Sequence, residues 1–307
     1  MKAAAIRSTE TSTRQDVYSR VTAKVIADLE QGVRTWMKPW SGANAEGRVT
    51  LPLRHNGLPY RGINILLLWG EALACGYTSN RWMTYRQAIE LGAHVRKGEH
   101  GSFVVYADHY TTKGENESGE AIERQIPFMK GYTVFNVEQI EGLAAEYYDR
   151  SAPAAEKIDL IESAESFFAA TGATFRHGGN MAYYAPGPDV IQLPEPEAFR
   201  DAEGYAAIKA HELTHWTKHK SRLDRDFECK RFADEGYSRE ELVAELGAAF
   251  LCVSLGITPE PREDHAAYIG HWLKVLKEDK RAIFSAAAHA QRAVDYLHAL
   301  QPKEHAE

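Results

Sequence analysis

The first clear pattern along the chain is an apolar residue at every fourth position of the segment 15–31. Residues four apart lie on one face of an α-helix, so this spacing predicts an amphipathic helix. Asp16 is a suitable N-cap for this helix, and Gly32 is a suitable residue to end it. The apolar positions are Val17, Val21, Val25 and Leu29.

The rest of the first half alternates short helices and strands with turns. Its longest apolar run, "INILLLW", is typical of a buried helix, and the run "SFVVYADHY" has the alternation of a strand. A stretch rich in Gly, Glu and Thr between two strand-like runs predicts a polar loop. The elements expected here are helices at 62–75 and 84–91, strands at 102–110 and 127–140, and a loop at 111–123.

The second half is predicted to be mainly helical. It follows the stretch "YYDRSAPAAEK" (147–157), which is typical of a linker, and the segment 173–194 predicts two or three short strands with Gly and Pro turns. Helices are expected at 155–171, 202–219, 238–255, 262–278 and 279–300. We therefore predict an α+β chain with a domain at residues 1–147, a linker at 148–157 and a second domain at 158–307.

Composition excludes several classes of protein. Hydrophobic residues make up 44% of the 307-residue chain and charged residues 26%, which is typical of globular proteins. Apolar runs stay well short of the roughly 18 residues that span a bilayer, and the first residues lack the apolar core of a signal peptide. The three cysteines are far apart and odd in number, so they do not make a disulfide framework. These features predict a cytoplasmic protein that does not contact a membrane.

The net charge of −7 conceals a basic segment. Residues 34–97 contain nine Lys and Arg but three Glu, and four of the six tryptophans lie at 36–82. Single-stranded nucleic acids bind to positive grooves with aromatic platforms, so this segment predicts binding of single-stranded DNA. The alternative is that most of these tryptophans pack in the core. The candidate DNA-binding residues are Arg34, Trp36, Lys38, Trp40, Arg54, Tyr60, Arg61, Trp82, Arg86, Arg96 and Lys97.

The stretch "HELTHWTKH" (211–219) carries the clearest candidate chemistry. His211 and His215 are four residues apart, so a helix presents both imidazoles to one ion. Zinc accepts such nitrogen ligands and lowers the pKa of a bound water, and Glu212 is placed to take the proton of that water. His219 continues the series, but eight residues span about 12 Å of an unbroken helix, so we do not expect it to reach the same ion.

A third metal ligand is expected from the helix at 238–255, where Glu241 and Glu245 share one face. We favour Glu241 as the ligand, with Glu245 orienting a ligand histidine. The alternative depends on "SREE", which can form a capping box with Ser238 as N-cap and would leave Glu245 as the better ligand.

The strand-like stretch "MAYYAPGPDVIQLP" precedes the motif helix and has a possible role in a peptidase. An extended substrate can pair with an edge strand beside the metal, and Tyr183 or Tyr184 could donate a hydrogen bond to a developing oxyanion. The alternative, that both tyrosines only pack, is equally open.

Long stretches of the chain resemble one family. The N-terminal third is similar to the N-terminal domain of ArdC-type antirestriction proteins, which also occurs in TraC-type plasmid primases, in "WMKPWSGANAEGRVTLPLRHNGLPYRGINILLLW" and "RWMTYRQAIELGAHVRKGEHG". The second half resembles the zincin-like metallopeptidase domain of that family in "HELTHWTKHKSRLDR" and "YSREELVAELGAAFL". The resemblance covers about residues 15 to 300 in the same order.

The resemblance implies a function and a site. It implies non-specific binding of single-stranded DNA, protection of incoming conjugative plasmid DNA from host restriction, and a gluzincin-like core. It also implies Zn²⁺, or Mn²⁺, held by His211, His215 and one glutamate of "EELVAE", with Glu212 as general base. Two alternatives stay open: a protease of the SPRTN kind that acts on DNA-bound proteins, and a regulatory peptidase that cleaves a repressor.

Overall fold

The computed structural model describes residues 16–32, 36, 50–115, 121–148, 157–227, 235–257 and 265–302. We refer to the described residues up to 148 as the N-terminal part and to those from 157 onward as the C-terminal part. The predicted linker falls mostly on residues 149–156, which lie outside the described residues, as do Arg34, Lys38 and Trp40.

The helices of the N-terminal part begin and end close to where the sequence predicts. Asp16 caps α1 (Val17–Glu30) by accepting a hydrogen bond from the Ser19 N–H. The left-handed Gly76 ends α2 (Ile63–Cys75), because glycine adopts this conformation without a steric penalty. A capping box of Thr84 and Gln87 begins α3 (Tyr85–Glu90). The remaining helical turns are η1 (Val137–Gln139) and α4 (Ala145–Tyr148).

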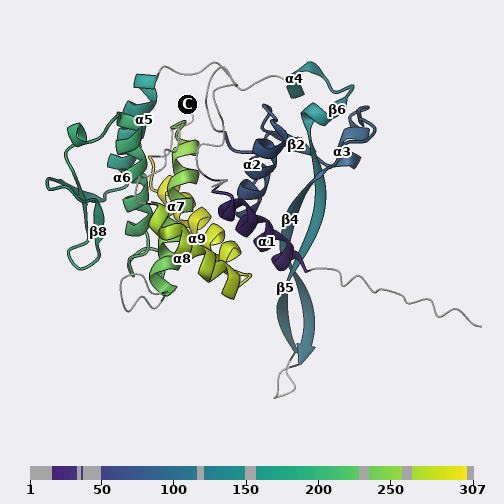
Figure 1. Cartoon of the computed structure of the whole chain (residues 1–307). Coiled ribbons are helices and arrows are strands. Elements are labelled where there is room, and N and C mark those ends of the chain that lie inside the picture. Colours follow the sequence, from purple (N-terminus) through teal and green to yellow (C-terminus); the bar gives the residue numbers. More distant parts are fainter. Residues whose placement is uncertain are drawn as a thin grey trace, which may run out of the picture.

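A four-stranded sheet in the order β1-β2-β5-β4 forms the β-structure beside these helices. Its strands are β1 (Leu53–Arg54), β2 (Arg81–Met83), β4 (Ser102–Glu115) and β5 (Ala121–Asn136), and a separate pair joins β3 (His94–Val95) to β6 (Ile140–Glu141). Figure 1 shows that β4 and β5 continue beyond the body of the molecule as a two-stranded ribbon.

The predicted loop at 111–123 is wrong for residues 111–115 and 121–123, because β4 and β5 stay paired as far as Glu115 and Ala121, and its remaining residues lie outside the described ones. The polar sequence at 111–113 reflects side chains that are exposed or half-buried, rather than an absence of strand. Backbone hydrogen bonds between the two strands do not require an apolar face.

The C-terminal part combines a small sheet with long helices. Its sheet has the order β7-β9-β8, formed by β7 (Thr174–His177), β8 (Tyr183–Ala185) and β9 (Val190–Leu193). The helices are α5 (Lys157–Ala170), α6 (Ala202–Trp216), α7 (Glu235–Ser254), α8 (His265–Glu278) and α9 (Ala282–Ala299), with a short turn η2 (Pro196–Ala198). The α+β class predicted from the sequence is confirmed.

The two parts share one hydrophobic core. α2 contacts both β4 and α9, and α1 contacts α8, so these two helices lie between the ribbon and the C-terminal helices (Figure 1). Trp69 of α2 packs edge-to-face on Phe250 of α7, with ring centroids 6.0 Å apart. Trp36 packs in the same way on Trp272 of α8, at 6.1 Å. The shared core makes the stability of each part depend on the other.

The described helices include none that is both long enough and apolar enough to cross a bilayer.

Candidate metal centre and nucleic-acid surface

The two motif histidines lie in the last two turns of α6. The Asp201 carboxylate caps the start of this helix by accepting a hydrogen bond from the Gly204 N–H at 2.8 Å. His211 and His215 are buried one turn apart, with ring centroids separated by 4.9 Å. The helix therefore presents two nitrogen donors on one side, where α7 packs against it.

A glycine allows α7 to approach this side of α6 closely. A Cβ atom at Gly247 would lie only 2.4 Å from Cγ2 and 2.8 Å from Oγ1 of Thr214, which is closer than van der Waals contact permits. The absence of a side chain at this position lets the two backbones come together. The carboxylates on the preceding turns of α7 are thereby brought to the histidines of α6.

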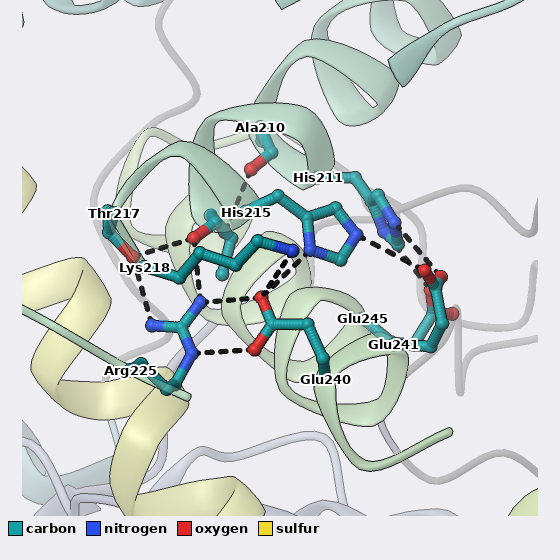
Figure 2. Close-up of polar contacts among 10 residues, drawn as sticks. Ala210, His211, His215, Thr217, Lys218, Arg225, Glu240, Glu241 and Glu245 are labelled. Atoms are coloured by element: carbon teal, nitrogen blue, oxygen red, sulfur yellow. Dashed lines mark hydrogen bonds and ion pairs between the residues drawn. The ribbon is translucent and has the colours of Figure 1, made fainter. Parts of the chain in front are cut away.

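Donor atoms of His211, His215 and Glu241 meet between the two helices, all within 4.8 Å of one another. His211 Nε2 lies 3.6 Å from one Glu241 oxygen, and His215 Nε2 lies 3.4 Å from the other (Figure 2). Two donors that share a tetrahedral zinc at its usual bond lengths lie about 3.3 Å apart. These separations fit a shared ion, so the C-terminal part carries a metal-binding site.

A buried carboxylate holds the second ring nitrogen of His215. Glu240 Oε1 lies 2.9 Å from His215 Nδ1, and Arg225 donates to both Glu240 oxygens at 2.8 and 2.9 Å. Arg225 also donates to the Thr214 carbonyl at 3.0 Å, which fixes it to the end of α6. A hydrogen bond from Nδ1 to Glu240 leaves the Nε2 lone pair directed toward Glu241.

The charges around this site favour a cation. Burial by itself would raise the pKa of Glu240, but the hydrogen bonds from Arg225 and His215 lower it to about 2. Burial would also raise the pKa of Glu241, but the adjacent His215 and His211 hold it well below its usual range. For His215, burial lowers the pKa, and the Glu241 charge and the Glu240 hydrogen bond more than reverse this effect. Both carboxylates are thus anionic in a buried site, which a bound cation stabilises.

The geometry distinguishes Glu241 from Glu245. Glu241 faces the Nε2 atoms of both histidines, whereas a Glu245 oxygen lies 3.6 Å from Nδ1 of His211, the other nitrogen of that ring. This arrangement supports Glu241 as the third ligand and Glu245 as a residue that orients His211. The capping box at Ser238 is wrong, because α7 already begins at Glu235 and Ser238 lies inside the helix.

The remaining residues of the motif lie in different surroundings. Glu212 is buried beside His211, with 3% of its surface exposed. α6 ends at Trp216, so His219 follows in a turn, where its Nδ1 lies 2.8 Å from the Ser221 hydroxyl. His219 is not in the metal group found among the described residues.

The two candidate tyrosines lie on β8, an edge strand of the small sheet. Tyr184 is buried, and its hydroxyl donates to Asp189 at 2.8 Å and accepts from Arg222 at 3.1 Å. The Tyr184 proton is therefore engaged away from any substrate. Tyr183 is 48% exposed, so it is the stronger candidate of the pair for contact with a substrate.

The structure corrects part of the predicted DNA surface. Trp36, Tyr60 and Trp82 are between 1% and 4% exposed, so protein atoms cover the ring faces that were expected to stack on bases. Trp36 and Trp82 pack edge-to-face on Trp272 and Tyr77. The alternative reading, that these rings belong to the core, is the correct one for them. The five candidate bases that are described and exposed are Arg54, Arg61, Arg86, Arg96 and Lys97.

Some of these bases are already paired on the surface. Arg86 bonds Glu90 and Arg96 bonds Glu99, each at 2.7 Å, and Arg61 pairs with Asp295 of α9. Arg54 instead lies over the Tyr60 ring, 5.5 Å from its centroid.

Glu240 and Arg225 are parts of the site that the sequence patterns did not indicate. Glu240 is adjacent to Glu241, and the 100° turn between neighbouring helix positions lets the two carboxylates reach different nitrogens of His215. The two consecutive glutamates are the feature of the sequence from which this arrangement could have been predicted. Arg225 lies in a loop after α6, and no spacing rule would have connected it to Glu240.

Comparison with known families assigns the same two parts. Residues 15–135 match the family described as the N-terminal domain of the anti-restriction factor ArdC, and residues 162–289 match zincin-like metallopeptidases. Fold and site thus define a zincin-like metallopeptidase domain joined to an ArdC N-terminal domain.

Solved structures support the assignment over nearly the whole chain. The metal-free crystal structure of antirestriction protein ArdC from plasmid R388 is 47% identical, with a TM-score of 0.76, and the match covers 93% of this chain and 98% of that one. Its Mn(II)-bound structure is 46% identical, with a TM-score of 0.75, over 94% and 100% of the chains. This chain belongs to the family of ArdC antirestriction proteins, as its motifs predicted.

Curated relatives extend the comparison. The chain is 41% identical over 295 residues to the uncharacterised protein y4eC of Sinorhizobium fredii (strain NBRC 101917 / NGR234), covering 94% of each. It is 37% identical over 310 residues to a DNA primase TraC of Escherichia coli and 38% identical over 300 residues to a second one. The chain spans only 28% and 20% of the length of these two primases.

Proposed function

We propose that this protein binds single-stranded DNA without strong sequence preference and protects incoming conjugative plasmid DNA from host restriction. The observation that carries this proposal is the match, over 93% of the chain, to an antirestriction protein. The similarity of this chain, over 95% and 92% of its length, to part of two DNA primases supports contact with DNA. Exposed arginines of the N-terminal part provide groups for phosphate contacts.

Two measurements test this function. The full-length protein is expected to bind labelled single-stranded oligonucleotides of unrelated sequence with similar affinity, and the affinity is expected to fall as salt is raised. A plasmid that encodes it is expected to enter a restricting recipient by conjugation more often than the same plasmid without it, with no difference in a non-restricting recipient. Absence of oligonucleotide binding, or an equal gain in both recipients, would contradict the proposal.

We further propose His211, His215 and Glu241 as the metal ligands and Zn²⁺ as the metal in the cell. Two imidazoles and one carboxylate suit zinc, which binds nitrogen donors more tightly than manganese does. The Mn(II)-bound ArdC structure keeps Mn²⁺ as the alternative. The test is the metal content of the purified protein, together with competition between the two ions. Preferential retention of manganese would overturn the assignment of zinc.

A second candidate function is proteolysis of a protein associated with the incoming DNA. A zinc ion in this site would supply a Lewis acid and lower the pKa of a coordinated water. The Glu212 carboxylate would accept the proton, and a peptide would pair with β8 beside Tyr183. The buried position of Glu212 next to His211 is the observation that favours this function.

One substitution separates the two functions. Glu212→Gln keeps the shape of the side chain but removes its capacity as a base, so metal content and DNA binding are expected to be unchanged. If this variant still protects plasmid DNA, proteolysis is not the protective mechanism. If protection is lost while DNA binding stays intact, proteolysis is required for it.

A further inference from the structure

A cavity of about 730 Å³ lies where the N-terminal end of α2, the edge strand β4 and the start of α9 meet. Its wall contains three arginines: Arg54 and Arg61 from the N-terminal part and Arg281 from the C-terminal part. No aspartate or glutamate is among the described residues that line it. We call it the arginine cavity, and its volume is within the usual range of ligand sites.

Aromatic rings hold two of these guanidinium groups. Arg281 lies over the Tyr18 ring, 5.1 Å from its centroid, and Arg54 lies over Tyr60 at 5.5 Å. In the described part of the chain, neither guanidinium is found in an ion pair with a carboxylate. Asp279 places a negative charge near Arg281, but it is not among the residues that line the cavity, so both guanidinium groups remain available to an anion there. Arg61 differs, because it pairs with Asp295.

The walls of the cavity are fixed by hydrogen bonds between elements. Asn64 of α2 donates to the Val105 carbonyl and accepts from the Val105 N–H, both at 2.8 Å, on the open edge of β4. The Gly62 N–H donates to Gln291 of α9 at 3.0 Å. These contacts join both parts of the chain around the cavity, so a ligand would meet a preformed site.

Aromatic side chains continue from the cavity onto the ribbon. Tyr106 lines the cavity and is 48% exposed, and its ring lies 6.0 Å from that of Phe128. The Phe128 ring in turn lies 6.1 Å from that of Tyr110, which is 52% exposed. Lys130, opposite Tyr106 in the strand pairing, lies over the Phe128 ring. Tyr106, Phe128, Tyr110 and Lys130 make up what we call the aromatic ladder.

We propose that the arginine cavity binds one nucleotide of a single DNA strand, and that the following nucleotides leave it along the aromatic ladder. The guanidinium groups would contact the phosphate, and Tyr106 would stack on a base. This inference rests on the proposed DNA binding and assigns its site. Arg281 and the neighbouring Phe284 belong to the C-terminal part, so the bound DNA strand would contact both parts of the protein.

The test measures binding of a fluorescent oligothymidylate to the full-length protein by anisotropy at several salt concentrations. Arg281→Gln is expected to lower the affinity about tenfold and to reduce the salt slope by about 0.7, the value for one phosphate contact in a single strand. Tyr106→Ala is expected to lower the affinity between about 5-fold and 100-fold with little change in the salt slope.

The matched control is Arg292→Gln, which removes an exposed arginine of α9, the helix that begins directly after Arg281, but outside the cavity wall. Its affinity and salt slope are expected to equal those of the wild type. Arg281→Lys retains the positive charge and is expected to keep most of the salt slope, which a purely structural role of Arg281 would not predict. Thermal unfolding of each variant verifies that the fold is retained.

The outcomes separate this inference from the proposed function. If the wild type does not bind the oligonucleotide, the proposed function fails and the cavity proposal fails with it. If the wild type binds and both cavity variants bind equally well, only the cavity proposal is overturned. Titration with dTMP alone distinguishes a site for free nucleotide. If dTMP saturates the protein while the cavity variants leave the affinity for the oligonucleotide unchanged, the proposal is also overturned.

Discussion

Residues outside the stretch "HELTHWTKH" hold one of its metal-binding histidines in its orientation. The ring of His215 could rotate, but Glu240 accepts a hydrogen bond from Nδ1, and Arg225 holds Glu240 through both of its oxygens. The orientation of His215 Nε2, the metal donor, thus depends on Arg225, which lies in the loop after α6. A motif read along one helix does not show this dependence.

Glu240→Gln is expected to weaken metal binding about 10- to 100-fold, as is usual when the partner of a ligand histidine is changed. The amide can still accept from His215, but it loses its charge and one of the two bonds from Arg225. Competition with a chromophoric chelator measures the change for Zn²⁺ and Mn²⁺.

The control for this variant is Glu235→Gln, which changes an exposed carboxylate on the same helix, α7. It is expected to bind metal like the wild type. Unchanged metal affinity of Glu240→Gln would show that Glu240 does not position His215.

A second residue-scale prediction concerns Asp189, which has φ of 56° and accepts a hydrogen bond from Arg222 at 3.0 Å. The Arg222 hydrogen bonds hold the pKa of Asp189 below its ordinary value. A depressed folded-state pKa stabilises the protein above the unfolded pKa, and this contribution is lost as pH falls through the folded value.

Asp189→Asn is therefore expected to lower the unfolding temperature at pH 7, and the difference from wild type is expected to shrink below about pH 4. Asparagine tolerates the positive φ, so the backbone conformation is retained. Thermal unfolding at several pH values checks this. A difference that stays constant down to pH 3 would rule out the charge of Asp189 as its cause.

At the scale of elements, the metal site depends on how closely α6 and α7 approach. The sequence predicts both helices, but their separation is decided by Gly247 against Thr214. The same is true of the ribbon, where pairing of β4 with β5 extends through a sequence that is polar enough to suggest a loop. Contacts between elements therefore decide both the separation of α6 from α7 and the length of the ribbon.

Gly247→Ala is expected to destabilise the protein by about 1–3 kcal/mol, because its Cβ would overlap Thr214. Thr214→Ala removes the two nearest atoms, so the double variant is expected to recover part of this loss. Urea unfolding of the four proteins of the cycle measures the coupling. Additive effects of the two substitutions would show that the close approach is not the cause.

At the scale of the whole molecule, the shared core joins the two predicted domains. Helices α1 and α2 contribute to the same cluster of buried residues as α7, α8 and α9. The boundary predicted at residues 148–157 stays a prediction. A fragment cut there would expose the faces of α1 and α2 that pack on the C-terminal helices.

Unfolding is therefore expected to occur in a single cooperative transition rather than in two. Trp36→Ala is expected to destabilise the whole protein by about 3–5 kcal/mol, since Trp36 is 1% exposed and packs on Trp272. Calorimetry and urea unfolding measure both effects. DNA affinity, measured well below the unfolding temperature, is expected to change little, and a selective loss of DNA binding would contradict the buried role of Trp36.

The sequence by itself determined the existence of the main helices, the caps of α1, α2 and α3, and the metal motif. Apolar periodicity, Asp16, Thr84 and Gly76 act within a few residues of the chain, and His211 and His215 meet because one helix turn joins them. The family could be identified from long motifs for the same reason, since each motif is continuous in sequence.

Only the tertiary structure decided which side chains are buried and which meet across elements. Trp36 and Trp82 are of a residue type that is common on DNA-binding surfaces, yet they lie in the core. Arg225 and Arg281 have no distinguishing spacing, because their partners Glu240 and Tyr18 come from other elements. Burial and contact between distant segments depend on how the elements pack, and a pattern within one segment does not contain that information.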